Sequence, residues 1–355
     1  MNEDSLMDAR AMKTETRPQT GAAGELPPWP VVAVYGAGAV GCYFGARLAE
    51  AGAPVTLIAR PHHVDAIRAE GLLFESGGRQ HRVAVAADTG TDPVRNADIV
   101  LFCVKTRDTP SGGAELRPLL KPGAIVVSLQ NGVDNVPRLR ETGVDALGAV
   151  VYVAASMAGP GHLLHAGRGD LVIGEYGTTT RHGTPPFDEA TSFDGPTSFD
   201  GTPSPRTALI SGLFERAGVG CKPVGDVRAE LWTKLVMNCV FNAMSALGHS
   251  HYGPLVERPD TRAVARDLVE ECVAVARAEG VAVADADTLY EAALRLGQAM
   301  APATSSTEQD LSLGRPTEID SLNGYVTARG EALGVATPVN RALAALVRVR
   351  ELALR

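Results

Sequence analysis

The sequence predicts an α/β fold in which a doubly wound parallel sheet is followed by an all-α C-terminal domain. Up to about residue 153, short runs rich in β-branched residues alternate with helical or loop segments, which is typical of a parallel sheet covered by helices. From about residue 226 onward the pattern changes to long helical periodicity. The chain has 355 residues, of which 45% are hydrophobic, so it is long enough for two domains with buried cores.

The first domain is expected at residues 30–225. Its parallel strands are predicted at 31–35, 55–58, 98–104, 124–129 and 146–153, with an antiparallel continuation at 162–165 and 171–173. A helix near 208–217 and a strand near 221–224 follow. Residues 1–29 are polar and unpatterned, which predicts a disordered tail. Residues 178–205 are rich in Thr, Ser, Gly and Pro and contain TSFDG twice, which predicts a flexible surface loop.

The second domain is expected at residues 226–355 and is predicted to be helical. Asp226 is a suitable N-cap for a first helix that extends through Ser245. Further helices are predicted at 261–279, 284–300, 317–333 and 340–354. The cleft between the two domains is the expected location of the active site.

A glycine-rich turn lies between the first strand and the first helix. The strand at 31–35 is followed by GAGAVG at residues 36–41, and a helix is expected from Ala39 to Glu50. In a Rossmann-type domain the first glycine makes the tight turn, the second admits a pyrophosphate, and the third lets the helix pack on the strand. The motif therefore predicts a dinucleotide site made by Gly36, Ala37, Gly38, Ala39, Val40 and Gly41. A purely structural strand-turn-helix corner is the alternative.

The end of the second strand indicates which dinucleotide is bound. Where a chain that binds NAD usually has Asp or Glu, this chain has Arg60, followed by His62 and His63. An arginine at this position suits the 2′-phosphate of NADP. An ordinary surface arginine at a strand end is the alternative.

Composition and charge exclude several classes of function. The formal net charge of −8 and the lack of a basic stripe argue against nucleic-acid binding. The five cysteines are far apart and lack a CxxC pair, so they are expected to be buried thiols and not disulfides or a metal site. Because the longest apolar stretch is too short for a membrane span and no signal peptide is visible, a cytoplasmic location without membrane contact is expected.

Polar residues that can carry chemistry lie on one helix and at two strand ends. Lys234, Asn238 and Asn242 follow one another at intervals of four, so they form a polar stripe on an otherwise apolar helix. Lys105 and Asn131 follow two buried strands, where ligands bind in open α/β sheets. The stripe could also be satisfied by neighbouring helices, and each loop residue alone could be structural.

Together, the motifs resemble those of the ketopantoate reductases (2-dehydropantoate 2-reductases). The motifs that carry the resemblance are GAGAVG, CVKT at 103–106, QNG at 130–132, ELWTKLVMNCVFN at 230–242, and SSTEQDL with GRPTEIDSLNG at 305–324. They occur in the family's order and span about 31–338. Where some members have an asparagine about ten residues past the second helix asparagine, this chain has His251 and Tyr252.

The resemblance implies roles for individual residues. Lys234 is the expected general acid, and Glu318 is a carboxylate close to the substrate and the nicotinamide ribose. By the same resemblance Lys105 and Asn131 contact the cofactor, and Asn131, Lys234, Asn238, Asn242 and Ser306 contact the substrate. No metal is implied.

The implied reaction is the reduction of ketopantoate to pantoate with NADPH, which supplies pantothenate and coenzyme A. The implied partner is a small 2-oxo acid, and a homodimer is compatible with the resemblance. Three other hypotheses stay open. One is NADPH-dependent reduction of another 2-oxo acid, and another is a β-hydroxyacid dehydrogenase, which also carries Lys-x-x-x-Asn but usually after a Gly-rich helix segment. The third is a non-catalytic NADPH sensor.

Overall fold

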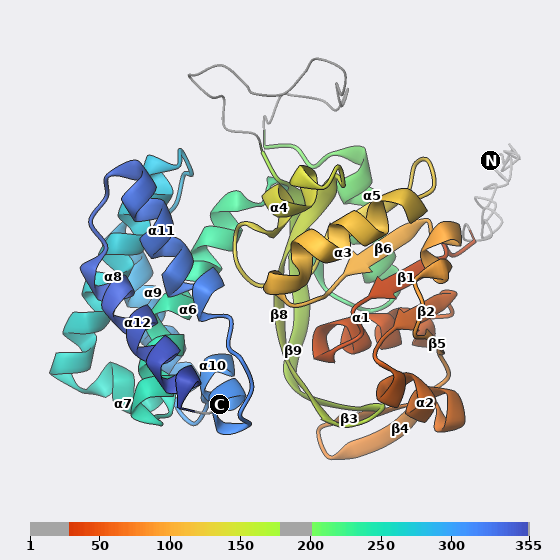
Figure 1. Cartoon of the computed structure of the whole chain (residues 1–355), viewed down its shortest axis with the longest axis horizontal. Coiled ribbons are helices and arrows are strands. Elements are labelled where there is room, and N and C mark those ends of the chain that lie inside the picture. The colour runs from red at the N-terminus through yellow and green to blue at the C-terminus, as the bar shows by residue number, and fades with distance from the viewer. Residues whose placement is uncertain (1–27, 178–200, 354–355) are drawn as a thin grey trace, which may run out of the picture.

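The computed structural model describes residues 28–177 and 201–353 (Figure 1). The loop predicted at 178–205 and its TSFDG repeat fall almost entirely outside the described residues. So does nearly all of the tail predicted at 1–29. Trp29 differs from that prediction, because its ring packs against the core of the first domain and the guanidinium of Arg216 lies 3.7 Å from the ring centroid.

A ten-stranded sheet forms the first domain, in the order β4-β3-β9-β8-β7-β6-β1-β2-β5, with β10 paired to β9. Its parallel part consists of β1 (Val32–Tyr35), β2 (Val55–Ile58), β5 (Ala86–Asp88), β6 (Ile99–Phe102), β7 (Ile125–Ser128) and the start of β8 (Ala146–Gly159). The strands β1 and β6 are buried along their whole length, as expected for a sheet covered on both faces.

Helices cover both faces of this sheet, as a doubly wound fold requires. On one face α1 (Ala39–Glu50), α2 (Pro61–Glu70) and α5 (Pro205–Arg216) contribute to the largest core cluster. On the other face α3 (Thr109–Leu116) and α4 (Asn135–Glu141) pack through Leu116 and Leu139. The predicted bounds of α1 are confirmed.

The antiparallel part of the sheet is larger than predicted. The strands β8 and β9 (His162–Glu175) are 14 residues each and form one long ribbon, so the two short segments predicted at 162–165 and 171–173 are one strand. The hairpin β3 (Leu72–Ser76) and β4 (Arg79–Val83) was not predicted. Four of the five residues of β4 are exposed, so its sequence RQHRV carries no apolar pattern.

The second domain contains the predicted long helices and two short ones that were missed. Its helices are α6 (Arg228–Gly248), α7 (Tyr252–Glu257), α8 (Pro259–Ala278), α9 (Ala286–Ala299), α10 (Ser306–Ser312), α11 (Asn323–Leu333) and α12 (Pro338–Leu352). The helix predicted at 317–333 is wrong at its start, because a 3₁₀ turn, η4 (Ile319–Ser321), comes before α11. The short α7 and α10 have too few turns to show a periodicity.

The start of α6 also differs from the prediction. Asp226 is the last residue of β10 (Cys221–Asp226), and the N-cap of α6 is Val227. The Asp226 carboxylate still accepts a hydrogen bond from the backbone N–H of Arg228 (3.0 Å), and it forms an ion pair with the Arg228 guanidinium (2.6 Å). In Figure 1, α6 is the helix of the second domain that lies nearest the β8–β9 ribbon.

None of the described helices is long and apolar enough to cross a membrane. The described cysteines are all free; Cys42, Cys221, Cys239 and Cys272 are buried and Cys103 is half-buried.

Candidate functional site

The turn between β1 and α1 leaves room for a phosphate. Gly36 has φ +95°, and a Cβ atom there would lie 2.8 Å from the backbone nitrogen of Val104, so only glycine fits. A Cβ on Gly41 would lie 2.8 Å from the Gly36 carbonyl, which explains the close packing of α1 on β1. By contrast, a Cβ on Gly38 would meet nothing within 4 Å.

The backbone donors of the same turn divide into two groups. The N–H groups of Gly36 and Ala37 already donate to the Ile58 carbonyl (3.2 and 2.8 Å). Those of Ala39 and Val40, in the first turn of α1, have no hydrogen-bond acceptor among the described residues. Free N–H groups at a helix N-terminus beside open space fit a pyrophosphate. The residues present therefore fit the dinucleotide that the sequence predicts.

Arg60 lies at the C-terminal end of β2, the strand beside β1, and immediately precedes α2. Its side chain is exposed and pairs with no carboxylate in the part of the chain that the structure describes. His62 is also exposed, whereas His63 is buried and its Nδ1 accepts a hydrogen bond from the Gly161 backbone (3.2 Å). Arg60 and His62 can therefore face a ligand, and His63 is held by the turn between β8 and β9.

Lys234, on α6, reaches across to the first domain. Its ammonium donates to Asn131 Oδ1 (2.9 Å) and to the Val151 carbonyl (2.6 Å). Because an ammonium has three N–H donors, one donor remains for a ligand. Burial lowers the pKa of Lys234 to about 8, with Glu318 opposing the shift and Arg168 adding to it.

Glu318, just before η4, also contacts the first domain. Its carboxylate lies 3.3 Å from Lys105 Nζ and accepts from the backbone N–H of Thr106 (3.3 Å). Asp310, on α10, is the second carboxylate near Lys105, at 3.6 Å. Burial raises the pKa of Asp310, and the Glu318 charge raises it further while Lys105 lowers it. Lys105 itself is half exposed, so it can reach a ligand as well as these carboxylates.

The loop after β7 places Asn131 between these groups. Gln130 anchors the loop, since its Nε2 donates to the Val104 carbonyl (3.0 Å) and to Thr109 Oγ1 (2.7 Å). Asn135 Nδ2 and Thr106 Oγ1 donate to the Asn131 carbonyl (2.6 and 3.3 Å). The Asn131 side chain is thereby left to accept from Lys234.

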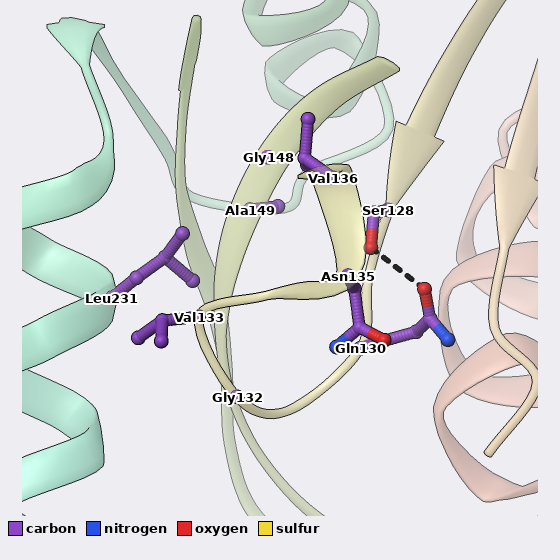
Figure 2. A pocket seen from close by; sticks show the side chains of 9 residues that line it. All are labelled: Ser128, Gln130, Gly132, Val133, Asn135, Val136, Gly148, Ala149 and Leu231. Atoms are coloured by element: carbon purple, nitrogen blue, oxygen red, sulfur yellow. Dashed lines mark hydrogen bonds between the residues drawn. The ribbon is translucent and has the colours of Figure 1, made fainter. Parts of the chain in front are cut away.

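A small cavity lies between this loop, α4, α6 and β8. Figure 2 shows that it is bordered by Leu231 of α6, Val136 of α4 and the β8 residues Gly148 and Ala149, with Ser128 donating to Gln130 (2.9 Å) nearby. It has room for about one water molecule. The cavity therefore belongs to the support of the loop.

The remaining predicted substrate residues lie on α6 and α10. The side chains of Asn238, half-buried, and Asn242, buried, make no hydrogen bond with other described residues, so both amides can bind a ligand. Ser306 is exposed at the start of α10. Its neighbour Ser305 caps α10 and donates to the Asn242 carbonyl (3.2 Å), which holds α10 against α6.

The chain is similar to proteins of one known family. Residues 32–178 match the family model described as ketopantoate reductase PanE/ApbA, and residues 226–351 match the model of its C-terminal part. The 2-dehydropantoate 2-reductase of Halobacterium salinarum is 32% identical over 90% of this chain and 98% of its own length. The chain belongs to the ketopantoate reductase family.

Solved structures agree with this membership. A PanE/ApbA family ketopantoate reductase from Ralstonia eutropha is 44% identical, with a TM-score of 0.79, over 91% of this chain and 99% of that one. A 2-dehydropantoate 2-reductase from Geobacter metallireducens is 29% identical, with a TM-score of 0.77, over 90% and 99%. A D-mandelate dehydrogenase solved with NADH and anilino(oxo)acetate shares the fold at 21% identity and a TM-score of 0.79, over 91% and 99%.

The structure adds three groups to the family motifs that the sequence singled out. Thr106 contacts both Glu318 and Asn131, and it stands inside the CVKT motif, so its position was visible but not its role. The Val151 carbonyl and the Tyr152 ring, both beside Lys234, come from β8. A backbone carbonyl carries no sequence signal, and a single tyrosine in a strand is usually a packing residue.

Proposed function

We propose that the chain is an NADPH-dependent reductase that converts ketopantoate to pantoate, as membership of the ketopantoate reductase family implies. The observation that carries the proposal is the free donor of the Lys234 ammonium, whose other two hydrogen bonds are fixed by Asn131 and Val151. A donor held at two points can present its third N–H to a substrate carbonyl oxygen in one orientation.

The glycine turn would hold the pyrophosphate of the cofactor at Ala39 and Val40, and Arg60 would pair with a 2′-phosphate. When bound, the nicotinamide supplies a hydride to the C2 carbonyl carbon of the substrate. Lys105 and Asn131 complete the proposed cofactor contacts at the ends of β6 and β7.

Lys234 would donate its proton to the carbonyl oxygen of the substrate as that oxygen becomes an alkoxide. Its pKa of about 8 suits this task, because the ammonium stays protonated near neutral pH and gives up its proton more readily than an ordinary lysine. Glu318 would keep the ammonium charged, since its carboxylate opposes the effect of burial on the pKa of Lys234.

The free amides of Asn238 and Asn242 support a substrate with a polar group beyond the ketone, and Ser306 would contact its carboxylate. A buried amide that loses its ligand partner is costly, so a substrate hydroxyl is recognised strongly. Tyr252 lies in the segment where some members of the family have an asparagine. Its ring stacks on the buried Phe241 at 4.4 Å between ring centroids, so it lies against the core of the helical domain.

The test is NADPH oxidation measured with ketopantoate and with its counterpart that lacks the 4-hydroxyl. We expect kcat/KM to favour ketopantoate by about 10⁴-fold, and this ratio to collapse in Asn242→Ala. A ratio near one in the unmodified enzyme would contradict the substrate and favour another 2-oxo acid. No oxidation with any 2-oxo acid would favour the non-catalytic hypothesis. We also propose a cytoplasmic location and a homodimer. Size measurement in solution tests the homodimer.

A further inference from the structure

Two cations lie over the ring of Tyr152, a residue of β8. The Lys234 ammonium is 5.9 Å from the ring centroid, and the Arg168 guanidinium carbon is 4.2 Å from it. The preceding residue, Val151, accepts a hydrogen bond from the same ammonium. Two consecutive residues of one strand therefore give Lys234 a carbonyl acceptor and an aromatic face.

The conformation of Arg168, on β9, is unusual and firmly held. Its φ of +50° is in the left-handed region, which is uncommon for a residue with a side chain, and it lies at a shift in the β8–β9 register. Its carbonyl accepts a hydrogen bond from His165 Nε2, and its guanidinium pairs with both carboxylate oxygens of Asp170 (3.0 and 2.7 Å). Such a backbone persists only where its surroundings fix it.

We propose that Tyr152 and Arg168 are positioning residues for Lys234. The Arg168 guanidinium fixes the Tyr152 ring by stacking, and the ring and the Val151 carbonyl together fix the ammonium. The inference rests on the proposed function, because it assumes that Lys234 donates the proton. Misplacing a proton donor by about 1 Å lowers the reaction rate strongly. A rigid support of Lys234 therefore favours turnover, although it requires the unusual backbone conformation of Arg168.

The charges around Lys234 have opposite signs. Glu318 faces it from the segment before η4 and favours its charged form, and Arg168 faces it from β9 and disfavours that form. Tyr152 is neutral, since burial raises the pKa of its phenol. The effect of Arg168 is limited, because Asp170 pairs with it and its side chain is 61% exposed, so salt screens it.

The first experiment needs no substrate. The rate at which acetic anhydride acetylates Lys234, followed by peptide mass spectrometry across a pH series, reports the pKa of its amine. In Arg168→Gln we expect the midpoint to rise by about 0.3 to 1 pH unit in dilute buffer, and by less in about 0.5 M NaCl. Arg266→Gln is the matched control, because Arg266 lies 5.1 Å from the Tyr290 ring on the exposed side of α8. An unchanged midpoint in Arg168→Gln would overturn the role of Arg168.

The second experiment tests the ring. In Tyr152→Leu we expect kcat to fall by about 3- to 30-fold with little change in KM, whereas Tyr152→Phe, which keeps the ring, retains most of the turnover. The Tyr152 hydroxyl makes no hydrogen bond with other described residues, so its removal is a fair test of the ring alone. Equal losses in both variants, or none in either, would overturn the proposal. If the unmodified protein reduces no 2-oxo acid, the proposed function fails, and the acetylation midpoint in Arg168→Gln still shows whether Arg168 acts on Lys234.

Discussion

The glycine turn after β1 and the support of Lys234 are built in opposite ways. The motif occupies six consecutive residues, 36–41, which form the turn after β1 and the first residues of α1, and Gly36 and Gly41 are required by atoms immediately around them. Lys234, in contrast, is held by Asn131 and Val151, which are 103 and 83 residues away in sequence, and Glu318 is 213 residues from Lys105. The glycine turn is thus local in sequence, whereas the support of Lys234 and Glu318 joins residues of both domains.

The largest expected effect concerns the non-local site. In Lys234→Ala we expect kcat to fall by about 10² to 10⁴-fold, the usual contribution of a positioned proton donor, with NADPH affinity nearly unchanged. Stopped-flow measurement of turnover and fluorescence titration of NADPH separate the two quantities. The control is Lys222→Ala, which removes an exposed ammonium paired with Glu230. Near-normal turnover in Lys234→Ala would mean that the proton comes from another group.

The local site is tested by two glycines of the same turn. In Gly36→Ala we expect both weaker NADPH binding and a loss of about 1 to 3 kcal/mol in the free energy of unfolding, because of the left-handed φ and the contact with Val104. In Gly38→Ala we expect weaker NADPH binding without a loss of stability, since the added methyl group meets only open space. Titration calorimetry and urea unfolding measure the two effects. Gly212→Ala, in α5, is the control, because its Cβ also meets nothing within 4 Å. Unchanged NADPH affinity in Gly38→Ala would place the pyrophosphate elsewhere.

The same contrast explains what could be predicted from the sequence. The start and end of α1 and the strands β1, β2, β6 and β7 follow from apolar runs and glycines that are close together in the chain. The stripe of Lys234, Asn238 and Asn242 was also visible, because helical spacing places it on one face. The hairpin β3–β4 was missed, since its exposed residues show no pattern and its pairing with β9 is set by distant residues.

The parts of the site that could not be predicted are contacts between residues of different helices, strands and loops. The acceptor for Lys234 is a backbone carbonyl of β8, and the contact of Thr106 with Glu318 joins residues 212 positions apart. Ser245 continues the polar stripe in sequence, yet its hydroxyl donates to the Ser250 carbonyl (2.7 Å) and accepts from the Ser305 backbone (3.2 Å). Helical spacing alone could not distinguish this structural serine from Asn238 and Asn242, whose side chains make no hydrogen bond with other described residues.

A smaller effect concerns the choice of cofactor. In Arg60→Asp we expect the preference for NADPH over NADH to fall by about 10-fold or more, because the carboxylate repels a 2′-phosphate and can accept from a 2′-hydroxyl. The ratio of kcat/KM for the two cofactors measures it. Arg79→Asp makes the same change of charge on the exposed strand β4 and serves as the control. Equal efficiency with both cofactors in the unmodified enzyme would mean that Arg60 does not select between them.

The smallest expected effect is on stability and follows from the pKa of Lys234. In the folded chain this pKa is about 8, below the ordinary value of 10.5, so between these pH values the unfolded chain binds more protons at this residue. The free energy of unfolding must therefore rise with pH between these two values. The buried Lys234 ammonium destabilises the fold at lower pH, and this destabilisation is lost as the ammonium deprotonates. Lys234→Met keeps the unbranched stem without the charge, so the difference between the two proteins isolates this residue. We expect the unmodified protein to gain about 1 to 3 kcal/mol relative to Lys234→Met between about pH 7 and about pH 10, measured by urea unfolding. If the stability difference between the two proteins stayed constant across this range, the Lys234 ammonium would be better solvated than its surroundings indicate. The lowered pKa expected of the proton donor would then be wrong.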